Sequence, residues 1–426
     1  MRGRRRGAAA TERGDPMLRY LAAVMLLLSV AMLGCASGTT APAASEPGYS
    51  FDGSISRSVL DSYLSRAVTH QGLLGSVPEP ATEYFDDDLR MLTEVGAKFV
   101  GRALHQYTVP DDMDDFYTAG ARRAARIHAR DPEIIIQASL FETTHRAIET
   151  VPVPSWVFEA FDRPLEERSF DYEATLYDDG HLHDQWAPGS SVPDMTKIET
   201  RMWFYYRACR AIDAGCESIH FGMADFMAEA DGATAAWDDL LTRVRSYAKT
   251  NARRHFVHCD AHTLGMKAGD RLLFDSGAAP LRIVEVQGQG MPAELRMGHP
   301  NSRYGDSPGG LTPSGWTCEH QPYLVEFDNW GSSGQGGVFR VGDPWTWGYD
   351  EISWLAHHDA TYRAQWLRYA YNWIGSNDPN GHLQVCTRRV LHDPVQGRLM
   401  YHANRQSDAC PVGFGDEDAI AALWAH

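Results

Sequence analysis

Two acidic side chains, Glu326 and Asp328, close an apolar run in the stretch LVEFDNWG. On an extended segment, side chains at alternate positions face the same side, so both acids are expected to face one site. A third acid, Glu142, ends the apolar run IIIQASLFE. Apolar surroundings raise the pKa of a carboxylic acid, which allows it to donate a proton near neutral pH. Because paired carboxyl groups of this kind hydrolyse glycosidic bonds, the sequence predicts Glu142 as general acid and Glu326 as nucleophile or base.

Polar residues also close the other predicted strands. In a barrel of parallel strands such residues face the mouth, so the set as a whole indicates a site. Taken singly, each acid has an ordinary explanation as a helix cap. Arg102 is expected to neutralise or position a carboxylate, and tryptophans in predicted loops are expected to stack on sugar faces. The predicted substrate-binding residues are Arg102, His105, Asp225, Asp260, His262, Asp328, Trp330 and Trp316.

The segment HCDAHT offers a different chemistry. His258, Asp260 and His262 alternate along one predicted strand, so their side chains share a face, as metal ligands would. Such nitrogen and oxygen donors bind zinc, which can generate hydroxide for hydrolysis. A metal-dependent hydrolase is therefore an alternative. The leading hypothesis needs no metal and no cofactor, with His258 buried below the mouth. The chain has no nucleotide-binding glycine motif and no GxSxG serine elbow.

The elements that must position these residues alternate between helix and strand. Their strands are apolar runs, which is typical of a parallel sheet buried on both faces. Seven or eight strands favour a closed (β/α)8 barrel of the TIM type, with long loops on its C-terminal face and insertions at about 165–195 and 289–321. The predicted strands are 97–104, 133–142, 218–226, 255–263, 271–275 and 281–288 as one or two, 323–329, and 382–390.

The N-terminal segment is typical of an exported lipoprotein. Residues 1–35 combine a basic start, an apolar core and Met-Leu-Gly-Cys, with Cys35 as the lipidated residue. The apolar core, 21–33, is short for a spanning helix, which needs about 20 residues. Residues 36–48 are predicted to be a flexible tether and 49–426 a single barrel domain. The expected location is outside the cytoplasm, at the periplasmic or cell-surface face, with membrane contact through the lipid alone.

The net charge limits the expected binding partners, and the cysteine count bears on disulfide formation. The net charge of −17 argues against nucleic acid, so a carbohydrate or glycoconjugate is the expected substrate. Six cysteines follow Cys35, an even number that is compatible with disulfides in an exported protein. The sequence does not predict an oligomeric state.

Several stretches together carry a family resemblance. KFVGRALHQY, IIIQASLFE, IETRMWFYYRACRAIDAGCESIHFGM, RRHFVHCDAH and PYLVEFDNWG resemble a group of uncharacterised bacterial exported lipoproteins with a glycoside-hydrolase-like (β/α)8 barrel, over roughly 85–391. The resemblance implies the fold and an association with carbohydrate. In retaining enzymes on such barrels two glutamates follow strands four and seven. Glu326 matches the seventh position, whereas the predicted fourth strand ends in HCDAH without Glu and the usual Asn-Glu pair is missing. This departure keeps both Glu142 and Asp225 as candidates for the acid. A non-catalytic carbohydrate-binding lipoprotein is the second alternative.

Overall fold

The computed structural model describes residues 48–263, 265–286, 293–299, 302–329, 336–338, 346–393 and 397–425. Eight parallel strands pair side by side, and the first pairs with both the second and the last, so the sheet closes into a ring. The ring strands are β1 (Ala67–His70), β3 (Phe99–Gln106), β4 (Ile135–Ser139), β7 (Ser218–Met223), β8 (His258–His262), β11 (Ser276–Pro280), β16 (Tyr323–Glu326) and β17 (Gly381–Asp393). The fold is a TIM-type (β/α)8 barrel, as the sequence predicts.

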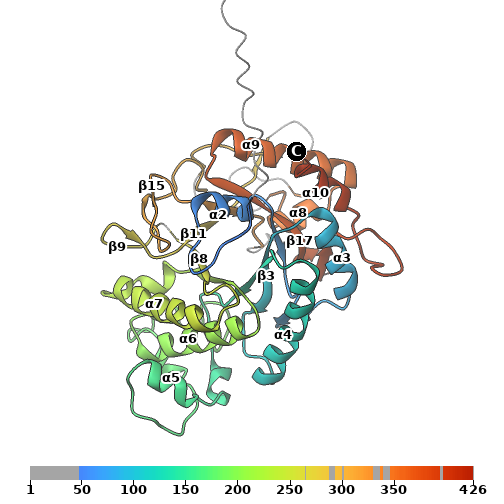
Figure 1. The fold of residues 1–426 in the computed structure, drawn as a ribbon. Coiled ribbons are helices and arrows are strands. Elements are labelled where there is room, and N and C mark those ends of the chain that lie inside the picture. The colour runs from blue at the N-terminus through green and yellow to red at the C-terminus, as the bar shows by residue number, and fades with distance from the viewer. Residues whose placement is uncertain are drawn as a thin grey trace, which may run out of the picture. The chain divides into compact units, whose positions relative to one another are not determined.

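Helices follow most of the ring strands and surround them (Figure 1). They are α2 (Arg57–Leu64), α3 (Phe85–Val95), α4 (Met113–Arg130), α5 (Ser155–Ala160), α6 (Ile198–Asp213), α7 (Ala233–Asn251), α8 (Glu351–Ala356), α9 (Ala360–Asn377) and α10 (Glu417–Leu423). Within the described ranges, no helix connects β8 to β11 or β11 to β16. These two connections instead contain short strands.

The remaining strands are short and are not members of the ring of eight. Two of them, β2 (Gly75–Val77) and β18 (Gly397–His402), pair with the ring strands β3 and β17. The others form three small sheets and are β5 (Thr144–His145), β6 (Ser190–Ser191), β9 (Lys267–Ala268), β10 (Arg271–Leu272), β12 (Val284–Glu285), β13 (Ala293–Glu294), β14 (Gly310–Leu311) and β15 (Thr317–Cys318).

Helix ends follow from local chemistry. α4 begins after Asp112, whose carboxylate accepts the N–H of Asp115 and so satisfies a free donor of the first turn. α3 ends at Gly96, whose φ of +77° is a left-handed conformation that glycine adopts without strain. The predicted helix over 350–374 is two helices, α8 and α9. The break occurs because Asp359 caps a new helix start by accepting a backbone N–H of the first turn of α9.

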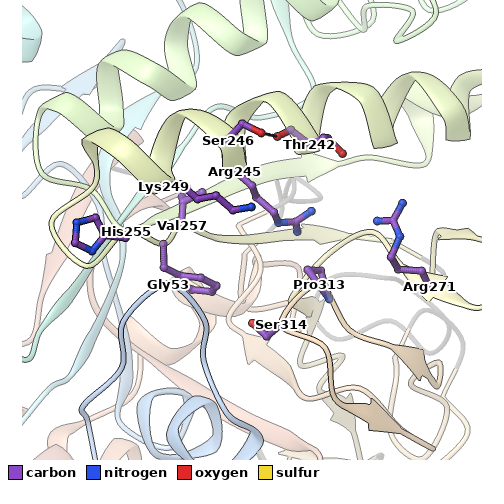
Figure 2. Close-up of a pocket in the computed structure, with 11 residues that line it drawn as sticks. Gly53, Thr242, Arg245, Ser246, Lys249, His255, Val257, Arg271, Pro313 and Ser314 are labelled. Carbon is purple, nitrogen blue, oxygen red and sulfur yellow. Dashed lines mark hydrogen bonds between the residues drawn. The ribbon is translucent and has the colours of Figure 1, made fainter.

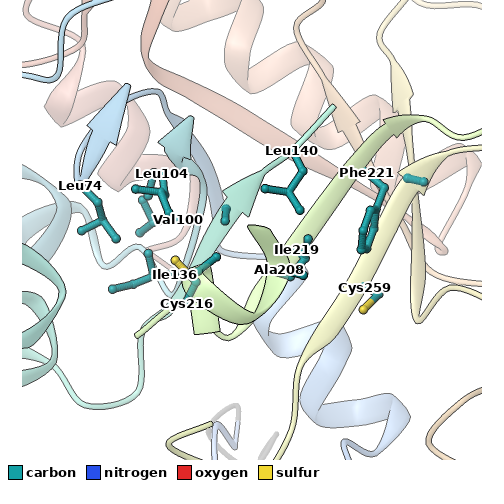
Figure 3. Packing of buried hydrophobic residues seen from close by; sticks show 14 of the residues in the cluster. Leu74, Val100, Leu104, Ile136, Leu140, Ala208, Cys216, Ile219, Phe221 and Cys259 are labelled. Atoms are coloured by element: carbon teal, nitrogen blue, oxygen red, sulfur yellow. The ribbon is translucent and has the colours of Figure 1, made fainter. Parts of the chain in front are cut away.

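Ring strands place apolar side chains toward the helices and polar ones toward the barrel axis. Figure 3 shows Ile136, Ile219 and Cys259, from three neighbouring strands, in the layer that packs under the helices. Burying an aliphatic side chain of this size contributes about 1.5–3 kcal/mol. Alternate residues point inward, so Gln137 and Asp260 meet across the interior with a hydrogen bond of 2.9 Å. The same alternation therefore builds both the core and a polar barrel interior.

Two ring strands fall where the sequence does not predict them. β1 is the short segment AVTH, and β11 is SGAAP, whose residues have a low intrinsic preference for strands. The stretches predicted as strands, 271–275 and 281–288, flank β11 and contribute only β10 and β12, outside the ring. β11 is a strand because β8 and β16 pair with it on both sides. HCDAH is consequently the fifth ring strand, and SIHFGM is the fourth.

Residues 47–426 form one compact unit. All six cysteines after Cys35 are free thiols in the structure, and five of them are buried, so no disulfide joins them. The predicted signal peptide and Cys35 lie outside the described residues, as does the tether apart from residue 48. In the described part of the chain, no helix combines the length and apolarity needed to cross a bilayer.

Candidate active site

Glu326 is the last residue of β16 and lies at the carboxyl end of the seventh ring strand. It is 3% exposed. Arg102 Nη2 donates to Oε1 at 2.6 Å and to Oε2 at 2.8 Å, while Nε donates to Oε2 at 3.2 Å. On the opposite side, His262 Nε2 lies 2.5 Å from Oε1. The barrel mouth therefore holds a buried carboxylate clamped between a guanidinium and an imidazole.

Glu326 and His262 each stabilise the charged form of the other. Burial alone would raise the pKa of Glu326, but the charges of Arg102 and His262 outweigh it and hold that pKa well below its usual range. Burial lowers the pKa of His262, yet the carboxylate of Glu326 raises it above the ordinary value. Glu326 is therefore an anion with matched counter-charges, which suits a nucleophile or base and not a proton donor.

Arg102 reaches the interior because β3 is irregular at this point. The register of β3 against β4 shifts between Val100 and Leu104, and Arg102 has a φ of +57°, in the left-handed region that side chains rarely adopt. The residue before it, Gly101, also faces inward, where an added Cβ would collide with Gln384. A backbone outlier of this kind costs about 1–3 kcal/mol and occurs most often at functional sites.

A second polar layer lies against the Glu326 group. Asp260 accepts from Gln137, and its other oxygen lies 3.4 Å from Nδ1 of His220. Nε2 of His220 is buried and has no hydrogen-bond partner within the described residues. The rings of His220 and His262 meet edge to face, with centroids 5.1 Å apart. An unpartnered buried nitrogen costs about 1–3 kcal/mol, so this one requires an explanation.

His258 does not join this group. Its two ring nitrogens lie 2.8 Å from Ser218 Oγ and 2.9 Å from Ser276 Oγ, nearer the amino ends of the strands. His262 lies four positions further along the strand, a distance of about 13 Å. The structure therefore does not bring together the predicted metal ligands His258 and His262, because inward-facing residues of one strand lie at successive levels.

Glu142 lies beyond the end of β4, the third ring strand, and is 6% exposed. Its Oε2 accepts the backbone N–H of Met223 at 2.8 Å. Met223 is the neighbour of His262 in the pairing of β7 with β8, and His262 contacts Glu326, so these two residues connect Glu142 to Glu326. The preceding residue, Phe141, has a φ of +54°, a second left-handed outlier at the mouth.

Gly222 leaves the space that the Glu142 carboxylate occupies. A Cβ on Gly222 would collide with Oε2 of Glu142, and its φ of +70° strains any side chain. We expect Gly222→Ala to displace this carboxylate and to lower the rate of a reaction that uses it by about 10²-fold. Gly232→Ala is the matched control, because Gly232 has a φ of +88° and nothing within 4 Å. Thermal unfolding and initial rates compare the two, and equal rates would contradict a catalytic Glu142.

Two further predicted residues lie beyond the strand ends. Asp225 follows β7 and accepts a hydrogen bond from Thr263 Oγ1 at 2.8 Å. Asp328 accepts from Arg282 Nη1 at 2.8 Å. Because β16 ends at Glu326, strand alternation no longer applies to Asp328, but its negative charge still raises the pKa values of Arg102 and His262. Asp225 thus follows the fourth ring strand, the place that the sequence assigned to HCDAH.

The remaining predicted residues are His105, Trp316 and Trp330. His105 contacts Arg389, with 3.4 Å between Nε2 and Nη1, and burial lowers its pKa well below the ordinary value. Trp316 Nε1 donates to the carbonyl of Ile55 at 3.0 Å, and its ring packs on the cluster at the amino ends of the strands. Trp316 is therefore not brought together with the glutamates. Trp330 lies outside the described residues.

Two cavities lie away from the glutamates. The first, of 220 Å³, lies beside α7 near Val257 and Pro313, and Figure 2 shows its basic side chains. Two of these are paired, Arg245 with Asp275 and Arg271 with Asp238. The second, of 700 Å³, has neither glutamate in its lining. We place the candidate site at the mouth because reactive groups converge there, which neither cavity offers.

Sequence reasoning missed two residues of the mouth. His220 is the third residue of β7, and Arg389 lies in the second half of β17, donating to Gln71 at 3.0 Å and to Asn329 at 2.6 Å. Inspection of strand ends alone does not find them. The inward alternation of SIHFGM, which turns Ser218 and His220 to one side, was the available signal for the histidine.

Comparison with known proteins adds a distant likeness of fold. No family model and no curated protein matches the chain. A debranching enzyme from Nostoc punctiforme matches with a TM-score of 0.30 at 12% identity, over 53% of this chain and 56% of that one. The glycoside hydrolase domain of PelA from Pseudomonas aeruginosa gives 0.31 at 9%, over 61% and 83%. An alpha-galactosidase from Thermus thermophilus gives 0.28 at 12%, over 48% and 41%. The chain thus spans about half of the debranching enzyme.

Proposed function

We propose that the protein hydrolyses a glycosidic bond, with Glu326 as nucleophile or general base and Glu142 as general acid. The observation that carries this proposal is the position of Glu326, a buried carboxylate at the carboxyl end of a barrel strand, held through both oxygens by Arg102. Active sites of (β/α)8 enzymes lie on this face. A carboxylate fixed in one orientation by a guanidinium loses little freedom on reaching the transition state.

The second carboxyl group supports a two-acid mechanism. Glu142 comes from a different strand of the same rim and reaches the site through Met223, next to His262. Glycoside hydrolysis needs two carboxyl groups on either side of the bond that breaks, one to protonate the leaving oxygen and one to attack or to activate water. In this proposal Asp225 and Asp328, beyond the neighbouring strand ends, bind sugar hydroxyls.

We also propose that the protein acts outside the cytoplasm, attached by a lipid on Cys35. The support is the sequence of residues 1–35, with its basic start, apolar core and small residues before the cysteine. Metabolic labelling with a radioactive fatty acid tests this. Label on the unmodified protein but not on Cys35→Ala is the expected result, and equal label on both would exclude the anchor.

Hydrolysis by the full-length protein in detergent, on a panel of aryl glycosides and oligosaccharides, tests the proposed reaction. We expect release of the aryl group or of reducing sugar from at least one substrate class. Each panel sugar is also added during thermal unfolding, which reports binding without turnover. No hydrolysis together with a sugar-dependent rise in Tm would identify a non-catalytic carbohydrate-binding protein. No hydrolysis and no rise in Tm would remove the carbohydrate proposal.

A further inference from the structure

Three side chains with metal-ligating atoms converge at the barrel mouth from three ring strands. His220 comes from β7, His262 from β8 and Glu326 from β16. One ligand atom of each lies within 4.8 Å of the other two, and within the described residues no other group of three or more His, Cys, Asp or Glu side chains meets this condition. Two imidazoles and one carboxylate form a ligand set that zinc and related transition-metal ions prefer.

The unpartnered nitrogen of His220 is the second, independent observation. His220 is 3% exposed, and its Nε2 has no hydrogen-bond partner within the described residues. Its other ring nitrogen, Nδ1, lies 3.4 Å from Asp260. Histidines that bind metals commonly donate their second ring N–H to a carboxylate, which fixes the tautomer and points the free lone pair at the ion. Gln137, by donating to Asp260, holds that carboxylate in place.

We propose that His220, His262 and Glu326 bind one divalent transition-metal cation of the zinc type. The ion takes the place of the proton between His262 Nε2 and Glu326 Oε1, now 2.5 Å apart, and that proton leaves to solvent. Ligand atoms around tetrahedral zinc are about 3.4 Å apart, so this contact opens by roughly 1 Å. Arg102, which also contacts Oε2, stays as the outer partner of the carboxylate.

The arrangement also indicates the class of ion. Magnesium and calcium take oxygen ligands almost exclusively, so two imidazole nitrogens favour Zn²⁺, Co²⁺ or Ni²⁺. Three protein ligands leave a fourth position, and the His262 side chain, 25% exposed, is the ligand that reaches solvent. This site goes beyond the proposed glycoside hydrolysis. Because both use Glu326, a bound cation is expected to inhibit that reaction.

Binding of the metal alone tests the site without any assay of hydrolysis. The full-length protein in detergent, treated with a chelator and then dialysed, is titrated with Zn²⁺ by calorimetry. We expect one equivalent to bind, with affinity at least ten-fold weaker in His220→Gln and in Asp260→Asn. His181→Gln is the matched control, because His181 is exposed and forms a surface pair with Glu229 at 2.6 Å. It should bind Zn²⁺ as the unmodified protein does.

A second measurement keeps the test decisive if the His220 variant does not fold. X-ray absorption at the zinc edge of the unmodified, zinc-loaded protein should show two imidazoles and one carboxylate in the first coordination sphere. Absence of stoichiometric binding, or full affinity in a folded His220→Gln, would overturn the proposal. A coordination sphere with fewer than two imidazoles would overturn it as well.

Discussion

Glu326→Gln is expected to lower kcat for glycoside hydrolysis by about 10³-fold or more. The substitution keeps the shape of the side chain, and its oxygen can still accept from Arg102. It removes the negative charge that attacks the sugar or activates water, and no other side chain in the described part of the mouth is clamped by Arg102 in this way. Initial rates on the best substrate of the panel, with circular dichroism to verify the fold, measure the effect.

Glu217→Gln is the matched control for this experiment. Glu217 is also buried and bonded to arginines, with Arg253 and Arg254 each 2.6 Å from its oxygens, but it lies before the amino end of β7. Loss of these two ion pairs should lower Tm and leave kcat unchanged. A folded Glu326→Gln whose kcat stays within about ten-fold of the unmodified protein would contradict the catalytic role. Retained configuration in the product of the unmodified protein would assign Glu326 as nucleophile, and inverted configuration as base.

Arg102→Met is expected to lower the free energy of unfolding by about 3–5 kcal/mol. The side chain of Glu326 is even less exposed than that of Arg102, so the substitution leaves a carboxylate in the barrel interior without its main counter-charge. The loss comes mainly from that unpaired charge and less from the contact itself. Urea unfolding of the unmodified and variant proteins measures it.

A double variant and a surface control separate these causes. Arg102→Met with Glu326→Gln removes both charges and should recover most of the stability, which appears as a large coupling energy. Arg296→Met breaks a solvent-exposed pair with Glu294 and should cost less than about 1 kcal/mol. If Arg102→Met cost no more than this surface variant, Glu326 would not be held as a buried anion.

Alternation within single strands made part of the site predictable. In HCDAH, three polar residues occupy positions of one parity, and all three face the barrel interior, although His258 lies lower than His262. The end of an apolar run likewise located Glu326 at the mouth. The prediction that Asp328 shares a face with Glu326 assumed a longer strand, and β16 ends at Glu326. Asp328 accepts from Arg282, and its charge also raises the pKa values of Arg102 and His262, the two partners of Glu326.

Strand identity was less predictable where local preference is weak. SGAAP has little tendency to form a strand alone, and β11 forms because both neighbouring strands bond to it. Because β1 was not predicted, the strands from β3 to β8 were each counted one place too early. Two predicted strands in place of β11 restored the count, so the strand of Glu326 is seventh in both. With β1 counted, Asp225 follows the fourth strand and Glu142 the third, which is the strand opposite that of Glu326 in the ring of eight.

By itself the sequence determined the fold class and the carboxyl groups at the strand ends, because periodicity and apolar runs are properties of consecutive residues. Only the tertiary structure decided the partners. Arg102 and Glu326 are 224 positions apart, and they meet because the ring closes and an irregular turn in β3 directs the guanidinium inward. His220 lies beside His262 because β7 pairs with β8, which again depends on the order of the strands in the ring. Such contacts depend on strand order and register, which are set by interactions among all the strands together and not by any one of them.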